Sequence, residues 1–238
     1  MIAKYGLDEM EFSQNYCFFY DQLEKANLFL QGIIDTSGKP MDDKMVEWLF
    51  KHPLSDGGQF TGVSDIIEKY GVVPKSVMVE TFSSENTGKM SNLIGLKLEG
   101  IWLQLREAAT AGASLPNWKR RRQKCWKQVY RMLVLTLGEP VSTFTWGLKG
   151  GEAKEYTPVS FYKEFLGNDL TNNYVMLMND PSREFYKCYE IDFDRHRYDG
   201  KNWTYVNLPI EDIKEIAIAS IKDSTMMLFF LRCRQVPR

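Results

Sequence analysis

Hydrophobic residues recur at helical spacing through the first 138 residues of the chain. Ser13 can cap a helix over residues 13–30, and a second helix is expected within residues 40–53, opened by acidic residues and ended by Pro53. The stretch SDGGQF at 55–60 then leads into a third helix that ends before Gly71. The apolar positions of the first helix are Tyr16, Phe19, Tyr20, Leu23, Ala26, Leu28 and Leu30.

Two longer amphipathic patterns follow. Residues 89–109 and 118–137 each carry one apolar face, and the sequence AGASLPN joins them. Gly138 ends the second pattern, as glycine commonly does at the end of a helix. We therefore predict a helical hairpin.

The pattern changes after Gly138 to short runs rich in Thr, Tyr, Phe and Val. YVMLMND, KCYEIDF, NWTYVNL and TMMLFF are strand-like, and one further helix is expected in EDIKEIAIASIKD. Helices that come first and strands that come later favour an α+β fold over alternating βαβ units.

Composition and charge restrict the possible partners. The chain has 30 basic and 31 acidic residues, so its net charge gives no reason to expect a nucleic acid or a membrane as partner. No leader peptide and no apolar run approaching the roughly 20 residues of a spanning helix is visible. The four cysteines form no C-x-x-C pair. We expect a soluble cytoplasmic protein with reduced thiols and without a metal or an organic cofactor.

A basic run in the second half of the hairpin allows two interpretations. With tryptophans at both ends, it could meet phosphates and stack on bases. The alternative, which the pattern favours, is the solvated face of an amphipathic helix. The run comprises Lys119, Arg120, Arg121, Arg122, Lys124 and Lys127, flanked by Trp118 and Trp126.

Two other groups could carry chemistry. The sequence DFDRHRYDG offers Asp192, Asp194, His196 and Asp199 as an ion loop, but it lacks the ligand spacing of a calcium loop, so a polar connection between strands is favoured. Cys17 could pair with His52 or His196 as a thiol catalyst. Because Cys17 lies in an apolar helix, a buried and inert cysteine is the favoured interpretation.

Gly57 and Gly58 are adjacent glycines in the loop before the third helix. Such a pair lets the backbone adopt positive φ and lets another backbone approach closely, as a loop needs in order to bind an extended peptide through main-chain hydrogen bonds. An ordinary turn before a helix is the alternative, and the residues alone favour it.

Four separated motifs resemble one family. EFSQNYCFFYDQLEKAN, DGGQF followed by IIEKYGVVPK, LGEPVSTFTW, and LPIEDIKEIAIASIKD are similar to the bleomycin hydrolase and bacterial aminopeptidase C family of papain-like cysteine peptidases. The resemblance runs in order from Met1 to Phe230. It implies a papain-like α+β fold with a helical-hairpin insertion. The parts would be a helical subdomain at 1–88, the insertion at 89–138, and a strand-rich part of the core at 139–230.

The resemblance also implies roles for particular residues. Gly58 would line the substrate cleft and bond the backbone of a bound peptide, and Gly57 would shape the loop. The insertion would help to build a homo-hexamer, and some family members bind nucleic acid. The activity implied is that of a thiol aminopeptidase, which removes N-terminal residues from peptides.

The family's catalytic residues have no counterpart in this chain. No Cys-Trp motif lies near the start, and Cys125-Trp126 falls inside the insertion. Neither His52 nor His196 lies at the place of the catalytic histidine, which would follow TMMLFF. We therefore expect an incomplete, inactive papain-like chain that lacks its catalytic helix. The alternatives are a nucleic-acid-binding module, or an inactive partner in an intact enzyme's hexamer, using the basic insertion.

The last eight residues, LRCRQVPR at 231–238, depart from the family. The segment expected there reads Ser-Cys-Asp-Val-Gly-Lys-Phe-Leu, and its codons read in a shifted frame can encode LRCRQVPR. The hypothesis is that a small insertion or deletion after Phe230 shifted the reading frame.

Overall fold

The computed structural model describes residues 1–54, 57–110, 115–191 and 195–225. The chain forms two compact units. The larger unit comprises residues 1–174 and 192–203, and the smaller comprises residues 175–191 and 204–238. The connection between the second and third strands of the smaller unit therefore belongs to the larger one.

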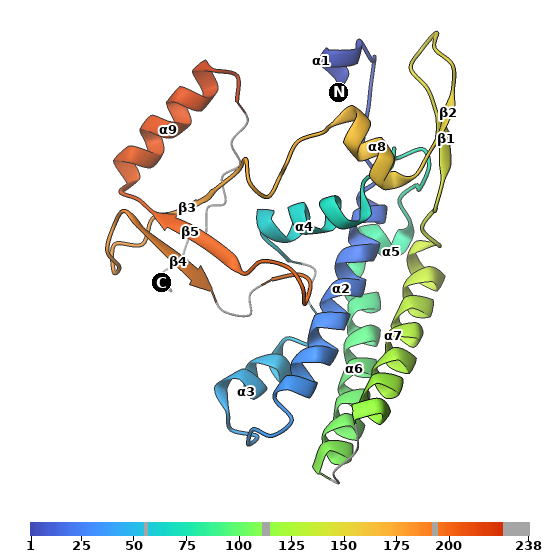
Figure 1. Ribbon diagram of the computed structural model, residues 1–238, viewed down its shortest axis with the longest axis vertical. Coiled ribbons are helices and arrows are strands. Elements are labelled where there is room, and N and C mark those ends of the chain that lie inside the picture. The colour runs from blue at the N-terminus through green and yellow to red at the C-terminus, as the bar shows by residue number, and fades with distance from the viewer. Residues whose placement is uncertain (55–56, 111–114, 192–194, 226–238) are drawn as a thin grey trace. The chain divides into compact units, whose positions relative to one another are not determined.

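The larger unit is mainly helical and is built around one long helix, α2 (Gln14–Asp35). Helices α3, α4, α6 and α7 all pack against α2 (Figure 1). The predicted helices and the helical hairpin are confirmed. The remaining helices and the strands of this unit are α1 (Ile2–Tyr5), α3 (Lys44–Lys51), α4 (Phe60–Tyr70), α5 (Phe82–Glu85), α6 (Thr87–Thr110), α7 (Leu115–Leu137), α8 (Pro158–Phe165), β1 (Phe144–Trp146) and β2 (Lys154–Tyr156).

Side-chain hydrogen bonds fix the start of α2. The Ser13 hydroxyl accepts a bond from the Tyr16 backbone N–H and donates one to the Met78 carbonyl at 2.5 Å. The Asn15 amide donates to the carbonyls of Val79 and Leu137, both at 2.8 Å. These bonds satisfy polar groups that folding removes from water, and they connect α2 to segments more than 60 residues away.

Apolar side chains fill the space around α2 and between the hairpin helices. Each removes surface from water, which supplies the main stabilising free energy of this unit. The largest fully buried apolar side chains are Tyr16, Phe19, Leu30, Ile33, Leu49, Ile66, Ile94, Leu98, Leu105, Leu133, Leu137 and Phe161.

Helix α8 lies in a region for which we predicted only strand-like runs. Thr157 and Ser160 form a reciprocal capping box at its start, and Pro158 occupies its first turn. Gly71, at φ +75°, ends α4 directly against the Pro158 backbone, where a Cβ would lie 2.1 Å from the Pro158 carbonyl carbon. The Thr-Pro-x-Ser signature was present in the sequence and could have predicted this helix.

The smaller unit contains a three-stranded sheet and one helix, α9 (Ile210–Lys222). Its strands are β3 (Met176–Met178), β4 (Lys187–Ile191) and β5 (Trp203–Asn207), in the order β3-β5-β4 with β3 parallel to β5. The three strand-like runs and the last helix are confirmed. The fourth run, TMMLFF, and the tail at 231–238 lie outside the described residues, apart from Thr225.

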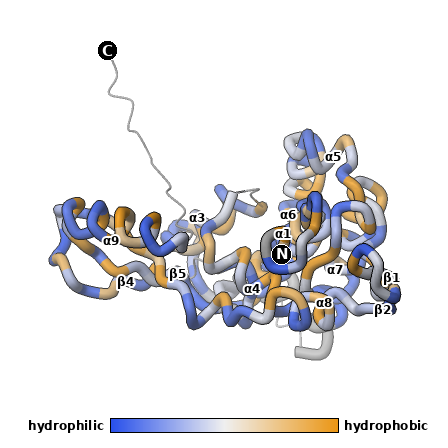
Figure 2. The backbone as a smooth tube through the Cα atoms, turned by 90° about the horizontal axis from the view of Figure 1, so that it is seen from above, coloured by the Kyte–Doolittle hydropathy of each residue, from blue (hydrophilic) through white to orange (hydrophobic). Residues whose placement is uncertain are grey.

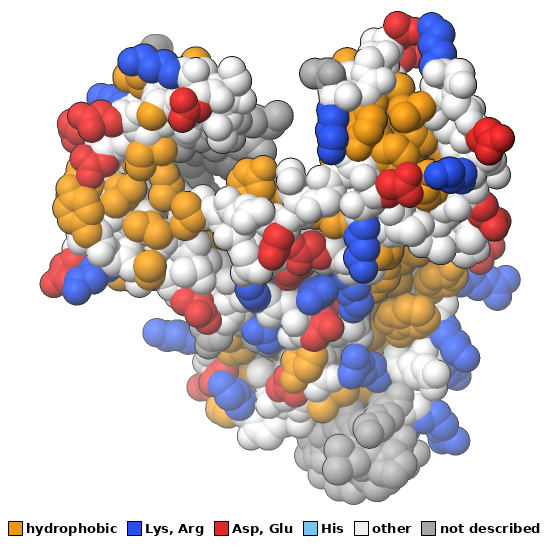
Figure 3. Space-filling model, turned by 45° about the horizontal axis from the view of Figure 1, so that its top comes forward, with side chains coloured by type: hydrophobic (Ala, Val, Ile, Leu, Met, Phe, Trp, Pro, Cys, Tyr) orange, Lys and Arg blue, Asp and Glu red, His pale blue; other side chains and the backbone are white. Residues whose placement is uncertain are grey.

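Hydrophobic side chains of the smaller unit remain on its surface. Helix α9 alternates between hydrophobic and hydrophilic positions (Figure 2), yet none of its residues is buried. Hydrophobic side chains appear on the surface at the left of Figure 3, where this unit lies in Figure 1. Ile218 and Ile221 are 53% and 74% exposed.

None of the helices in the described residues combines the length and the apolar composition needed to cross a membrane. The division at residues 88, 138 and 230 that the resemblance implies stays a prediction.

Candidate functional site

The double-glycine loop is attached to α2 by a lysine. The Gly57 carbonyl accepts a hydrogen bond from Lys25 Nζ at 2.7 Å, and the same ammonium pairs with Asp21 at 2.7 Å. Lys25 lies one helical turn after Asp21, so both face the loop from one side of α2. Gly57 and Gly58 are themselves exposed.

The imidazole of His196 explains why two positions near this loop are glycine. A Cβ on Gly58 would lie 2.1 Å from His196 Cε1, and a Cβ on Gly62, in the first turn of α4, would lie 2.3 Å from the ring. By contrast, a Cβ on Gly57 would meet nothing within 4 Å. Gly58 is outside the positive-φ region, so it does not use the backbone freedom that we expected. Close approach is what requires glycine here, and the group that approaches is a side chain.

Asp21 holds the His196 ring in this position. His196 Nδ1 lies 2.5 Å from Asp21 Oδ1, and the histidine side chain is only 4% exposed. Burial opposes ionisation of Asp21, but the bonds from His196 and Lys25 outweigh it and hold the pKa of the carboxyl below its usual value. An ionised carboxylate only accepts hydrogen bonds, so Nδ1 carries a proton and donates a hydrogen bond to Asp21.

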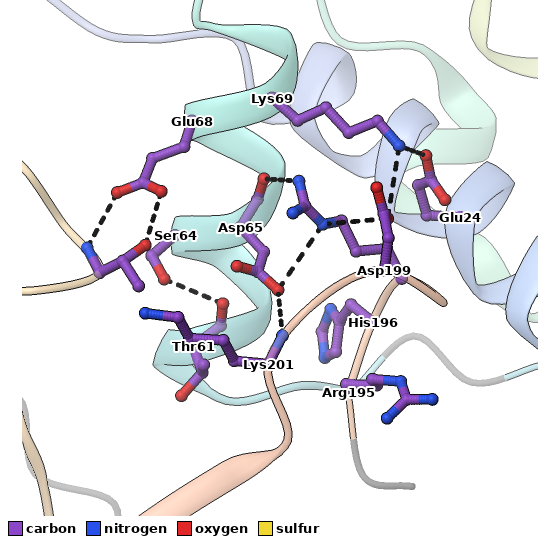
Figure 4. A network of polar contacts seen from close by, with 12 residues as sticks. Glu24, Thr61, Ser64, Asp65, Glu68, Lys69, Arg195, His196, Asp199 and Lys201 are labelled. Carbon is purple, nitrogen blue, oxygen red and sulfur yellow. Dashed lines mark hydrogen bonds and ion pairs between the residues drawn. The ribbon is translucent and has the colours of Figure 1, made fainter.

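The turn at residues 195–201 is fastened to α4 by a second carboxylate. Asp65 accepts a hydrogen bond from the Lys201 backbone N–H at 3.2 Å (Figure 4). The same carboxylate lies 3.8 Å from the Arg197 guanidinium. A Cβ on Gly200 would lie 2.3 Å from the same carboxylate. Burial raises the pKa of Asp65, although Arg197 and the Lys201 N–H oppose the shift.

A lysine of α4 joins the turn to α2. Lys69 Nζ lies 2.7 Å from Glu24 and 3.7 Å from Asp199 (Figure 4). The Tyr70 hydroxyl donates to the same Glu24 carboxylate. We call the set formed by Asp21, Glu24, Lys25, Asp65, Lys69, His196, Arg197, Asp199 and Lys201 the polar clamp.

The sequence DFDRHRYDG thus contributes a polar connection. Asp199 is engaged with Lys69 and Arg197, and His196 is engaged with Asp21. Asp192 and Asp194 lie outside the described residues. Across the residues that are described, no three His, Cys, Asp or Glu side chains are grouped closely enough to hold a metal ion.

Cys17 has the properties of an inert cysteine. Burial raises the pKa of its thiol to about 12, and the nearby charges of Asp21 and Glu80 act in the same direction. The thiol is therefore protonated at neutral pH and is a poor nucleophile. His196 is bonded to Asp21, and the ring of His52 lies 3.1 Å from the Trp48 carbonyl.

Among the side chains of the basic run that the structure describes, no aromatic platform of the kind that the nucleic-acid interpretation requires is present. Arg122 donates to Gln31 and Asn27 on α2, at 2.5 and 2.8 Å. Trp126 stacks on Tyr130, with ring centroids 5.6 Å apart. The remaining cations whose side chains are described, Arg120, Arg121, Lys124 and Lys127, are exposed, which agrees with the favoured interpretation of a solvated helix face.

Comparison with known proteins shows the family. The model of the Peptidase C1-like family matches residues 1–235, and the chain belongs to this family. It is 37% identical to aminopeptidase C of Listeria monocytogenes and 32% identical to bleomycin hydrolase of Mus musculus, covering 94% and 96% of this chain. The crystal structure of PepW from Lactobacillus rhamnosis superposes with a TM-score of 0.87 at 32% identity, covering 94% of this chain.

The comparisons confirm the resemblance and the papain-like α+β fold class, and the relatives that the chain matches are named aminopeptidase C and bleomycin hydrolase. The chain spans about half of these proteins, because each match covers 52% of the relative's length. The roles of Gly57 and Gly58, the hexamer and nucleic-acid binding stay predictions.

Reasoning from the sequence missed most of the polar clamp. Asp21 and Lys25 have the i, i+4 spacing of a helical ion pair, and Gly62 is a glycine in the first turn of a predicted helix, so both carried a signal. His196 is the residue that Asp21 bonds and that Gly62 accommodates. It lies 175 residues beyond Asp21, and no local sequence pattern connects these two residues.

Proposed function

We propose that the double-glycine loop forms one wall of the peptide-binding cleft of a cytoplasmic thiol aminopeptidase, and that this chain does not cleave peptides by itself. The observation that carries the proposal is the environment of Gly58. Gly58 is exposed, yet the direction in which a side chain at this position would project is filled by His196. What Gly58 presents to solvent is therefore main chain, which an extended peptide can pair with through hydrogen bonds.

The proposed activity rests on the family. The relatives carry the names aminopeptidase C, aminopeptidase G and bleomycin hydrolase. A thiol peptidase needs a thiolate with a histidine to share its proton. In this chain burial raises the pKa of both the Cys17 and the Cys125 thiols, and His196 serves to hold the loop. We infer that the nucleophile and its histidine are supplied by sequence beyond the half of the enzyme that this chain represents.

Peptide binding tests the role of Gly58. The probe is a fluorescein-labelled alanine tetrapeptide, with fluorescence polarisation as the readout. Gly58→Ala alone is ambiguous because the new methyl group strikes His196. The double variant Gly58→Ala with His196→Ala removes that clash, because the methyl group occupies the space that the ring leaves. We expect this variant to bind the peptide within about twofold of His196→Ala alone, whereas Gly58→Ala by itself, which must displace the loop, should bind at least tenfold more weakly than the parent chain.

Gly57→Ala is the matched control, since its Cβ enters open space. We expect its affinity for the tetrapeptide to stay within about twofold of the parent chain. Equal affinity of Gly58→Ala and the parent chain would remove Gly58 from the cleft.

Activity is tested separately. The purified chain is incubated with aminoacyl-arylamide substrates, and we expect no release of the arylamine. Sustained hydrolysis that iodoacetamide abolishes would contradict the proposal that the chain is inactive by itself.

A further inference from the structure

Helix α6 carries a second apolar stripe on the side that faces solvent. Leu93, Leu96 and Leu103 are 59%, 65% and 54% exposed, and Gly100 lies between the last two. The steps from residue 93 to 96, 100 and 103 are three, four and three, which is the spacing of the a and d positions of a coiled-coil heptad. We call these four residues the heptad face.

The heptad face is distinct from the face that packs in the core. Ile94, Leu98, Ile101 and Leu105 of the same helix are buried. Single exposed leucines are normal on a protein surface, but three in heptad register form a continuous stripe. A Cβ at Gly100 would meet nothing within 4 Å, so the middle of the stripe is open to the close approach of another helix.

A cationic groove runs beside the heptad face. A cavity of about 790 Å³ between α6 and α7 is lined by Leu96 and Gly100 together with the four cations Lys97, Arg120, Arg121 and Lys124. Within the part of the chain that the structure describes, none of the four cations has an ion-pair partner, and no acidic residue lines the cavity.

Three of these cations act electrostatically on the thiol of Cys125, a buried residue that also lines the groove. Burial raises the pKa of the Cys125 thiol, and Lys97, Lys124 and Arg121 oppose the shift. The cations therefore produce a positive field inside the groove, where an anionic group would be attracted most strongly.

We propose that the heptad face and the cationic groove together dock an acidic amphipathic helix of a partner protein. The apolar side of that helix would cover Leu93, Leu96 and Leu103, and its carboxylates would lie against Lys97, Arg121 and Lys124. This site is independent of the double-glycine loop and of the proposed peptidase function.

Charge favours this occupant over an isologous antiparallel pairing of two copies through the heptad face. In the heptad, Lys97 follows Leu96 at an e position, on the side where the groove runs. An isologous antiparallel pairing would bring each cationic rim against its own copy, and like charges in contact are unfavourable. An acidic helix has no such repulsion.

Apolar surface decides between this occupant and a nucleic acid. The heptad face offers leucines, whereas binding of single strands relies on aromatic side chains for base stacking. Trp126, the one tryptophan of the basic run whose side chain is described, is stacked on Tyr130 and does not line the groove.

The test uses a synthetic helical peptide with leucine at the a and d positions and glutamate at the flanking positions, measured by fluorescence polarisation. A second peptide carries lysine in place of glutamate. We expect the glutamate peptide to bind the 238-residue chain at least tenfold more tightly than the lysine peptide. Leu96→Glu with Leu103→Glu should lower that affinity at least tenfold.

Charge exchange supplies the specific control. Lys97→Glu with Lys124→Glu should reverse the preference, so that the lysine peptide binds more tightly than the glutamate peptide. All of these side chains are exposed, and far-UV circular dichroism and thermal unfolding verify that the variants fold. Leu135→Glu, at a leucine of α7 that is 77% exposed and lies outside the groove, should leave the affinity within about twofold.

Three outcomes would overturn the proposal. The first is equal binding of the two peptides. In the second outcome, a single-stranded oligonucleotide of equal charge displaces the glutamate peptide, and the leucine substitutions do not change the affinity for that oligonucleotide. The third is self-association of the parent chain in sedimentation that Leu96→Glu with Leu103→Glu abolishes, which would assign the heptad face to a second copy.

Discussion

The two units bury different kinds of side chain. The larger unit has an apolar core around α2, α6 and α7, with Phe19, Leu98 and Leu133 completely enclosed. Among the described residues of the smaller unit, the only buried side chain is a polar one, Asn207. The smaller unit also leaves several isoleucines on its surface, including four of α9.

The difference indicates two sources of stability. Burial of apolar surface scales with area and tolerates local change, whereas a hydrogen-bonded cluster depends on each donor and acceptor. The Asn207 amide donates to the carbonyls of Asp180, Arg183 and Glu184, and its oxygen accepts from the Asp180 N–H at 2.8 Å. One side chain therefore ties β5 to the turn that follows β3.

The largest effect is expected in the apolar core of the larger unit. Phe19→Ala removes a ring that contacts Tyr20 and Tyr130 edge to face, and it should lower the free energy of unfolding by about 3–5 kcal/mol. Urea unfolding followed by circular dichroism measures the loss. Leu135→Ala is the exposed control and should stay within about 0.5 kcal/mol of the parent. A loss at Phe19 below about 1 kcal/mol would show that this core is loosely packed.

An intermediate effect is expected in the smaller unit. Asn207→Ala leaves several backbone groups without partners and should destabilise this unit by about 2–3 kcal/mol. Amide hydrogen exchange should show faster exchange in β3 and β5, with the amides of α2 and α7 unchanged. Asn179→Ala removes only one exposed bond, to the Leu208 carbonyl, and serves as the control. Faster exchange across both units would mean that they do not unfold separately.

The smallest effect on the free energy of unfolding is expected in the polar clamp, a set of charged side chains in the larger unit, whose core is otherwise apolar. The pKa of Asp21 is lower in the folded chain than its unfolded value of about 3.9, so its contribution is present above that pH and is lost as the pH falls through the folded pKa. Asp21→Asn should cost about 1–2 kcal/mol at neutral pH, because bonds to a charged acceptor are stronger than bonds to a neutral one.

The pH dependence identifies the charge as the cause. The difference in unfolding free energy between Asp21→Asn and the parent should shrink below about pH 4, as the parent carboxylate becomes protonated. Asp8→Asn, which removes an exposed pair with Lys149, should cost less than about 1 kcal/mol. A constant difference at all pH values would attribute the effect of Asp21→Asn to packing.

Local patterns predicted the elements better than the site. Ser13 before an apolar period, Asp43 before α3 and Gly138 after α7 each act within one or two helical turns, so the sequence reveals them directly. Helix α8 was missed because its capping box lies among residues with strand preference. Gly58 was identified as special, but the reason is the imidazole of His196, which only the fold brings beside it.

The long sequence separation within the polar clamp has a consequence for biosynthesis. Asp21 and His196 are 175 residues apart, and Asp65 and Arg197 are 132 residues apart. At about 5–20 residues per second, a ribosome needs roughly 10–35 s to proceed from Asp21 to His196. For most of that interval α2 and α4 are already synthesised, yet the space beside Gly58 and Gly62 has no imidazole to fill it. The double-glycine loop therefore acquires its final support only after most of the chain has been translated.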